Sequence, residues 1–108
     1  MTATFVQVTS LDQLAPGTGT AVSFAGDDIA LFNVDGRVFA IDDLCMRCGA
    51  SLAAGTLLGL DVTCSGCDWR YDVSTGNVVG VPGLRADRFQ VTIVDSKILL
   101  SGPRGLAL

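Results

Sequence analysis

The chain has 108 residues, with 11 acidic and 7 basic side chains, four cysteines and no histidine. Without histidine there is no imidazole general base, no Ser-His-Asp or Cys-His nucleophile, and no His-ligated catalytic zinc. The formal net charge of -4 leaves no basic stripe that could neutralise nucleic-acid phosphates. We therefore expect a chain that is not an enzyme by itself, with protein partners and neither a nucleic acid nor a small-molecule substrate.

The length fits a single domain over residues 1–108. Hydrophobic residues make up 49% and charged residues 17%, which favours a compact folded body. All acidic residues are Asp and the only Lys is Lys97, so long surface helices are not expected. The most apolar stretch, residues 52–60, is far below the roughly 20 residues that cross a bilayer. Because the N-terminus also lacks the pattern of a secretion signal, we expect a cytoplasmic protein with no membrane segment.

Short segments rich in β-branched and aromatic residues predict an antiparallel barrel or sandwich. In the first part of the chain we predict a strand over residues 4–8, one capped helical turn over 10–14, a strand over 20–24 and a turn at 26–27. Strands at 28–34 and 37–41 then flank Asp35 and Gly36. This pair is a strong hairpin signal because glycine tolerates the positive φ of a two-residue turn.

A second hairpin is predicted near the C-terminus. Residues 88–93 alternate polar and apolar side chains, Asp95 and Ser96 form the turn, and residues 97–100 return. The segment 101–105 is interpreted as a frayed end.

Between the two hairpins, the cysteines form two matched pairs. Cys45 and Cys48 make one C-x2-C pair, and Cys64 and Cys67 make a second pair fifteen residues later. This spacing is typical of a tetrahedral four-thiolate metal site. Two disulfides or four buried core thiols are the alternatives. A reducing compartment opposes the disulfides, and cysteines that only fill the core would not fall into two matched pairs. No βαβ pattern surrounds either pair, which disfavours a thioredoxin-like redox motif.

The spacing alone leaves three metal centres open: Zn²⁺, a single iron ion, or a [2Fe-2S] cluster. A closed set of four cysteines leaves no open coordination position, so hydrolytic zinc catalysis is disfavoured. The site is therefore structural or carries electrons.

The segments around the cysteines carry a further pattern: Ile41-Asp42-Asp43-Leu44, Gly49-Ala50-Ser51-Leu52-Ala53, Gly55-Thr56-Leu57 and Asp68-Trp69-Arg70-Tyr71-Asp72-Val73. With these motifs the chain resembles a Rieske-type ferredoxin from about residue 5 to residue 100. The resemblance implies an all-β Rieske fold, a small antiparallel β-sandwich or barrel. It also implies a metal-binding subdomain of two loops at about residues 43–80.

The ligand pattern departs from that family. Its signature is Cys-x-His in the first loop and Cys-x2-His in the second, with two Cys on one iron and two His on the other. Cys45 and Cys64 stand at the cysteine positions and Cys67 at the second histidine position, while Arg47 replaces the first histidine and Cys48 follows it. The first loop thereby resembles the knuckle of rubredoxins and zinc ribbons, which favours one ion. The cluster stays open because the Rieske architecture holds one between these loops.

The resemblance implies a ferredoxin-like carrier that passes single electrons from a reductase to an oxygenase-like acceptor through an iron centre on the four cysteines. The alternative is a zinc-binding module that uses the same four cysteines, with a structural or interaction role and no redox activity. Strand spacing predicts that Trp69 and Tyr71 both turn into the core beneath the site. The resemblance also implies that the loop at residues 81–84 covers the centre.

Overall fold

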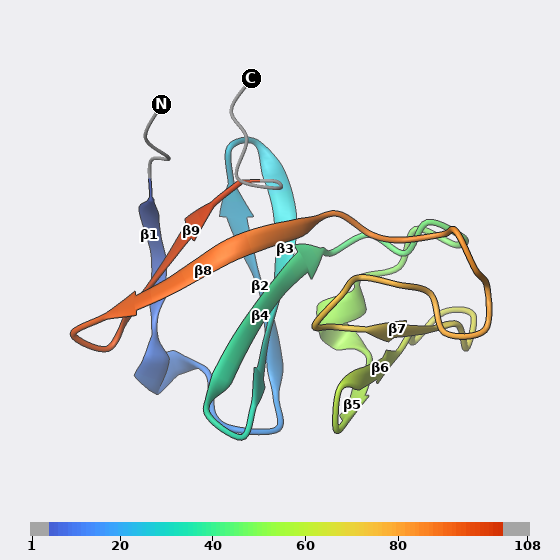
Figure 1. Cartoon of the computed structure of the whole chain (residues 1–108), viewed down its shortest axis with the longest axis horizontal. Coiled ribbons are helices and arrows are strands. Elements are labelled where there is room, and N and C mark those ends of the chain that lie inside the picture. Colours follow the sequence, from blue (N-terminus) through green and yellow to red (C-terminus); the bar gives the residue numbers. More distant parts are fainter. Residues whose placement is uncertain (1–4, 103–108) are drawn as a thin grey trace.

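The computed structural model describes residues 5–102, which form antiparallel strands and two short 3-10 turns (Figure 1). The larger sheet consists of β1 (Val6–Ser10), β2 (Gly19–Phe24), β3 (Asp27–Val34), β4 (Arg37–Asp42), β8 (Arg88–Val94) and β9 (Lys97–Ser101). A smaller sheet is made of β5 (Thr56–Leu58), β6 (Asp61–Thr63) and β7 (Arg70–Asp72). The 3-10 turns are η1 (Leu11–Gln13) and η2 (Leu52–Ala54). Within the described residues, no helix is long and apolar enough to cross a membrane.

The larger sheet curls into an almost closed barrel. Its strand order is β1-β9-β8-β4-β3-β2, all its pairings are antiparallel, and the two edge strands β1 and β2 contact each other. Each of the six strands contributes apolar side chains to one interior cluster, whose fully buried members are Leu14, Ile29, Leu31, Ala40, Ile98 and Leu100. The all-β barrel expected from the sequence is confirmed.

Strand β3 is buried on both faces. Ile29 and Leu31 belong to the barrel interior, whereas Ala30 and Phe32 belong to a second cluster outside it. Successive side chains of a strand point to opposite faces, so a strand covered on both sides shows a continuous apolar run and not an alternation. This strand therefore joins the barrel to the rest of the molecule.

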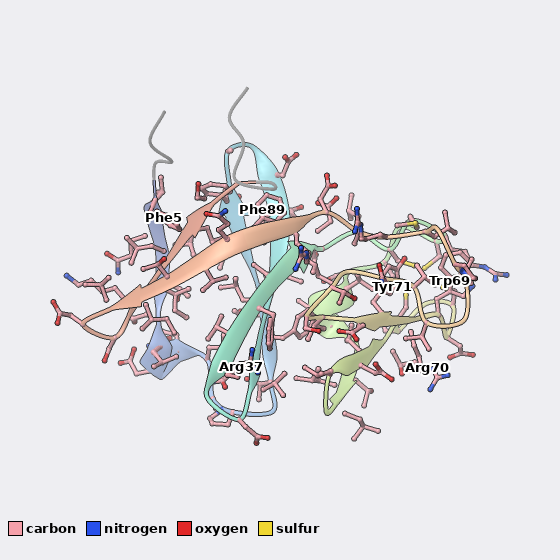
Figure 2. All side chains as sticks on the ribbon, in the orientation of Figure 1. Phe5, Arg37, Trp69, Arg70, Tyr71 and Phe89 are labelled. Atoms are coloured by element: carbon pink, nitrogen blue, oxygen red, sulfur yellow. The ribbon has the colours of Figure 1, made fainter. Side chains whose placement is uncertain are left out.

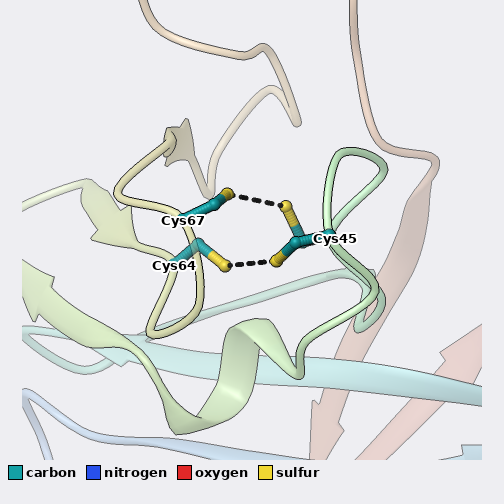
Figure 3. Close-up of side chains that lie close together, drawn as sticks. Cys45, Cys64 and Cys67 are labelled. Atoms are coloured by element: carbon teal, nitrogen blue, oxygen red, sulfur yellow. Dashed lines mark hydrogen bonds between the residues drawn. The ribbon is translucent and has the colours of Figure 1, made fainter.

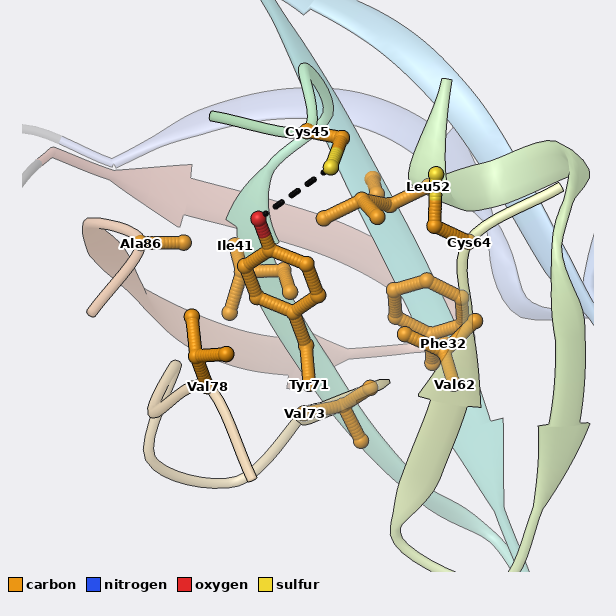
Figure 4. Close-up of a cluster of buried hydrophobic side chains, with 11 residues drawn as sticks. Phe32, Ile41, Cys45, Leu52, Val62, Cys64, Tyr71, Val73, Val78 and Ala86 are labelled. Atoms are coloured by element: carbon orange, nitrogen blue, oxygen red, sulfur yellow. Dashed lines mark hydrogen bonds between the residues drawn. The ribbon is translucent and has the colours of Figure 1, made fainter. Parts of the chain in front are cut away.

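The second cluster fills the space between the outer face of β3 and β4 and the smaller sheet (Figure 4). Phe32 and Ile41 come from the barrel side, and Val62 and Tyr71 from the smaller sheet. Cys45 and Cys64 are members of the same cluster; the others are Ala30, Leu52, Val73, Val78 and Ala86. The segment between β4 and β8 thus packs on the barrel through a core that includes two of the four cysteines.

Both predicted hairpins are present. Asp35 and Gly36 have φ of 52° and 92°, as a two-residue turn with two left-handed positions requires. The turn before β3 differs from its prediction. It consists of Ala25 and Gly26 with φ of 54° and 87°, because Asp27 already pairs with Phe24 across the hairpin.

Three further expectations are corrected at element ends. The first strand extends to Ser10, and its predicted start at residue 4 lies outside the described residues. The turn after it is a 3-10 turn without a side-chain cap, because the Ser10 hydroxyl donates to Asp12 Oδ1 at 2.6 Å. Ser101 is buried in β9 and pairs with Gln90, so it is no frayed end; residues 103–105 of that predicted segment lie outside the described residues.

Candidate metal centre

The four cysteines lie on two loops that face each other beside the smaller sheet. The first loop follows β4 and carries Cys45 and Cys48; the second joins β6 to β7 and carries Cys64 and Cys67. The four Sγ atoms all lie within 4.8 Å of one another. The short distances run between the loops, 3.6 Å from Cys45 to Cys67 and 3.5 Å from Cys48 to Cys64 (Figure 3). The sequence pattern predicted this gathering.

All four cysteines are free. Their sulfur separations of 3.5 and 3.6 Å are far longer than the roughly 2.05 Å of a disulfide bond. The structure therefore contradicts the two-disulfide alternative.

The two loops share one backbone design. In the first, the N–H of Gly49 donates to the carbonyl of Cys45 at 2.8 Å, and the Cys45 N–H donates to the carbonyl of Ala50 at 2.9 Å. The second loop repeats both bonds at the same spacing, from Asp68 to Cys64 at 3.3 Å and from Cys64 to Trp69 at 2.7 Å. Each loop therefore closes the same turn around its pair.

The fifth residue of each turn, counted from the first cysteine, has a left-handed backbone conformation. Gly49 has φ of 78° and Asp68 has φ of 65°. Glycine adopts this conformation freely, whereas an aspartate there is uncommon. Asp68 thus adopts the backbone conformation that Gly49 has at the matching position of the first loop, although it is not a glycine.

Backbone N–H groups also point at the sulfurs in a matched way. Cys45 Sγ accepts from the N–H groups two and three positions ahead, those of Arg47 and Cys48. Cys64 Sγ accepts from the corresponding groups of Gly66, at 3.3 Å, and Cys67. Such donors stabilise negative charge on a thiolate. Both loops therefore prepare their first cysteine as a metal ligand.

Tyr71 adds a side-chain donor beneath the site. Its Oη donates to Cys45 Sγ at 3.4 Å (Figure 4). The same oxygen accepts from the Met46 N–H at 3.1 Å. Burial and the Cys45 bond raise the pKa of Tyr71 above its usual value, so the phenol stays protonated and remains a donor.

The thiols compete for negative charge. Burial raises the pKa of Cys45, but hydrogen bonds from Tyr71 and from two backbone N–H groups outweigh it and lower this pKa to about 6. Burial raises the pKa of Cys64. The Trp69 N–H lowers the pKa of Cys67, but desolvation and the neighbouring thiols raise it to about 12. One thiolate is thus favoured and further ones are penalised, so holding four thiolates requires a cation among them.

The centre is covered unequally. Cys45 and Cys64 are 2% and 1% exposed, Cys67 is half-buried and Cys48 is exposed. Arg47, at the displaced histidine position, lies over the Trp69 ring with its guanidinium carbon 5.5 Å from the ring centre. One edge of the site, marked by Cys48, therefore faces the surface.

The aromatic prediction is half right. Tyr71 is fully buried, whereas Trp69 is half-buried and packs at the margin of the same cluster, with its ring 6.5 Å from that of Tyr71. Figure 2 shows both rings at the end of the molecule away from β1. In the loop at 81–84, Val81 packs against the cluster and Pro82 is exposed. Its role as a cover for the centre stays a prediction.

Asp43 is a site residue that the sequence reasoning missed. It is buried, and its Oδ1 accepts from the Ser51 hydroxyl at 2.8 Å and the Ala53 N–H at 2.9 Å. It thereby ties the two ends of the first cysteine loop together. An aspartate just before a C-x2-C loop, with a serine just after it, is the signal that could have indicated this clamp.

The mixed ligand set implied by the Rieske resemblance does not fit this chain. There is no histidine, and the donors that come together are four sulfur atoms. A four-sulfur set suits iron or zinc, and it leaves no open position for a substrate. The chemistry that such a site can support is metal binding and, with iron, one-electron exchange.

Comparison with known proteins agrees with the fold. The model of the Rieske [2Fe-2S] domain matches residues 4–98. The ferredoxin component of the naphthalene 1,2-dioxygenase/salicylate 5-hydroxylase systems of Ralstonia sp is 33% identical over 82 residues, 76% of this chain and 79% of that protein. The ferredoxin of carbazole 1,9a-dioxygenase from Nocardioides aromaticivorans superposes with a TM-score of 0.84 at 33% identity, covering 91% of this chain and 97% of its own. A chain from a complex of reduced oxygenase and oxidized ferredoxin in carbazole 1,9a-dioxygenase gives a TM-score of 0.84 at 26% identity, covering 95% and 97%. The chain belongs to the Rieske [2Fe-2S] domain family.

Proposed function

We propose that this protein is a one-electron carrier whose iron centre is held by Cys45, Cys48, Cys64 and Cys67. The observation that carries the proposal is the gathering of four Sγ atoms within 4.8 Å of one another at the place where a Rieske fold carries its metal centre. Iron in such a site alternates between Fe³⁺ and Fe²⁺, so it takes up one electron and releases one electron.

The residues around the sulfurs suit this task. Backbone N–H groups and Tyr71 Oη donate to the buried sulfurs, and such donors stabilise the extra negative charge of the reduced state. The buried side of the centre excludes water, while the exposed Cys48 offers an edge through which an electron can enter and leave.

The relatives indicate the partners. The Ralstonia relative is the ferredoxin component of dioxygenase systems, and a similar ferredoxin is known in complex with its oxygenase. We propose that this chain likewise accepts an electron from a reductase and delivers it to an oxygenase-like acceptor. It acts as one domain with a metal-binding subdomain at about residues 43–80, in the cytoplasm, where thiols stay reduced and available to metal.

The test is the metal and colour of the full chain produced in iron-replete cells. We expect bound iron, visible absorption from thiolate-to-iron charge transfer, and bleaching when a reductant adds one electron per chain. A reductase of the dioxygenase type should then transfer an electron to the protein. Cys48→Ser should lower the amount of iron bound per chain.

A colourless protein that holds one zinc ion after iron-replete expression and after anaerobic reconstitution with Fe²⁺ would contradict the carrier. It would favour the zinc-binding module, because zinc has no redox chemistry. Reconstitution is needed as a control because a four-thiolate site binds zinc readily during overproduction.

A further inference from the structure

We infer that the four cysteines hold a single metal ion without bridging sulfide, in place of the two-iron cluster after which the family is named. The inference rests on the metal binding in the proposed function but not on the identity of the metal. It concerns how many metal atoms the two loops can enclose.

Sulfur spacing is the first argument. Four thiolates around one ion at about 2.3 Å form a tetrahedron whose edges are about 3.8 Å long. The measured contacts between the loops are 3.5 and 3.6 Å, and no pair among the four exceeds 4.8 Å. A two-iron cluster places two bridging sulfides between its irons, so ligands on different irons stand well beyond one tetrahedral edge.

The identity of the close pairs is the second argument. In the family pattern, Cys45 and Cys64 would share one iron, and Cys67 would take the place of a histidine on the other. Cys45 and Cys67 would then lie on opposite sides of the cluster, yet their sulfurs are 3.6 Å apart. The sulfurs of Cys48 and Cys64, which the same division would also separate, are 3.5 Å apart.

A division by loops, with Cys45 and Cys48 on one iron and the second pair on the other, would separate the same two close contacts. The last division, with each close pair on its own iron, meets a limit in how tightly the two loops are packed and closed. A Cβ on Gly66 would stand 2.9 Å from Cys48 Sγ and 3.0 Å from the Ala50 Cβ. The second loop therefore touches the first at this point, and only a glycine allows the approach. Two sulfide ions between the pairs would have to separate the two sulfurs within each loop beyond the 4.8 Å that now bounds all four, against the backbone hydrogen bonds that close each turn, from Gly49 to Cys45 and from Asp68 to Cys64.

The matched design of the loops is the third argument. The hydrogen bonds that close each turn, the left-handed fifth residue and the amide donors to the first sulfur all recur at equal spacing. The close contacts join the first cysteine of one loop to the second cysteine of the other. This approximate two-fold relation suits a tetrahedral site with four like ligands, and the unequal loops and mixed ligands of the family signature cannot show it.

The experiment measures nuclearity in three ways on the full chain. Native mass spectrometry and elemental analysis count metal per chain, a sulfide assay detects bridging sulfide, and Co²⁺ titration of the reduced, metal-free chain gives the number of equivalents bound. We expect one metal ion per chain, no acid-labile sulfide, and a titration that ends at one equivalent with the absorption of tetrahedral cobalt thiolate.

A variant pair tests that all four sulfurs share this ion. Cys48→Ser removes an exposed ligand without touching the core, and we expect at least about a tenfold loss of Co²⁺ affinity. Ser65→Ala, an exposed change inside the second loop, should leave the affinity unchanged. Unchanged affinity in Cys48→Ser would overturn the shared site.

The outcomes separate the two proposals. Two irons with two sulfides per chain would overturn the single ion and leave the electron carrier standing. One zinc ion without sulfide, with iron not accepted, would support the single ion and contradict the carrier. A chain that binds no metal in any of the three measurements overturns both.

Discussion

The hydroxyl of Tyr71 offers a direct test of how the protein tunes its centre. Tyr71→Phe keeps the buried ring in the cluster and removes the donor that lies 3.4 Å from Cys45 Sγ. The reduced centre carries one more negative charge on its sulfurs than the oxidised one. Losing this hydrogen bond therefore destabilises the reduced state and lowers the reduction potential.

The magnitude follows from the value of one hydrogen bond. A net contribution of about 0.5 to 1.5 kcal/mol corresponds to about 20 to 65 mV for a one-electron couple, at 59 mV per tenfold change. The Met46 N–H, 3.1 Å from the same oxygen, loses its acceptor too, but Met46 is exposed and water can replace it. We therefore expect the fold to lose only about 1 kcal/mol.

The assay is a potentiometric titration followed by visible absorption, with thermal unfolding in parallel. Val73→Ala is the matched control, since Val73 is buried in the same cluster and its apolar side chain has no hydrogen to donate to a sulfur. It should lower the free energy of unfolding by about 1 to 3 kcal/mol and leave the potential unchanged. An unchanged or raised potential in Tyr71→Phe would refute the reasoning.

Three other substitutions test the surroundings of the site. Asp43→Ala leaves two half-buried donors of the first loop without their carboxylate, so the free energy of unfolding should fall by about 2 to 4 kcal/mol in chemical denaturation; a loss below about 1 kcal/mol would argue against the clamp. Gly66→Ala drives a Cβ toward Cys48 Sγ, to 2.9 Å, and should lower metal affinity about tenfold in chelator competition, with Ser65→Ala as the unchanged comparison. Burial and three neighbouring aspartates raise the pKa of Asp42, so its charge costs stability above that pKa and the cost disappears as the pH falls through it. Asp42→Asn should therefore raise the free energy of unfolding at neutral pH by a solvent-screened amount on the order of 0.5 kcal/mol, visible as a higher melting temperature, and not in acid; an equal gain at both pH values would contradict this explanation.

The barrel was predictable because its signals are local. Asp35 and Gly36 set a turn by their own backbone preferences, and the alternation in residues 88–93 needs only one covered face. The smaller sheet was not predicted, because β5, β6 and β7 have three residues each, too few to show a period. Their pairing depends on the second core and on the cysteine loops, which are contacts distant in sequence.

The gathering of the four sulfurs was predictable from spacing, but their neighbourhood was not. Nothing in the sequence distinguishes Cys45 and Cys64 from the second cysteine of each pair, yet these two are the ones buried in the core. The Asp43 clamp and the approach of Gly66 to Cys48 arise between segments, so residue type alone does not reveal them. Trp69 shows the opposite error: strand spacing placed it inward with Tyr71, but it precedes β7 and lies at the margin.

The two-sided burial of β3 has a consequence for folding cooperativity. Removing the segment between β4 and β8 would leave Ala30, Phe32 and Ile41, now buried, as a bare apolar strip on the outside of the barrel. Exposed strips of this kind promote aggregation. The barrel is thus no independent scaffold onto which a metal module was added. Loosening either layer removes the cover of the other, so we expect both to unfold in one transition.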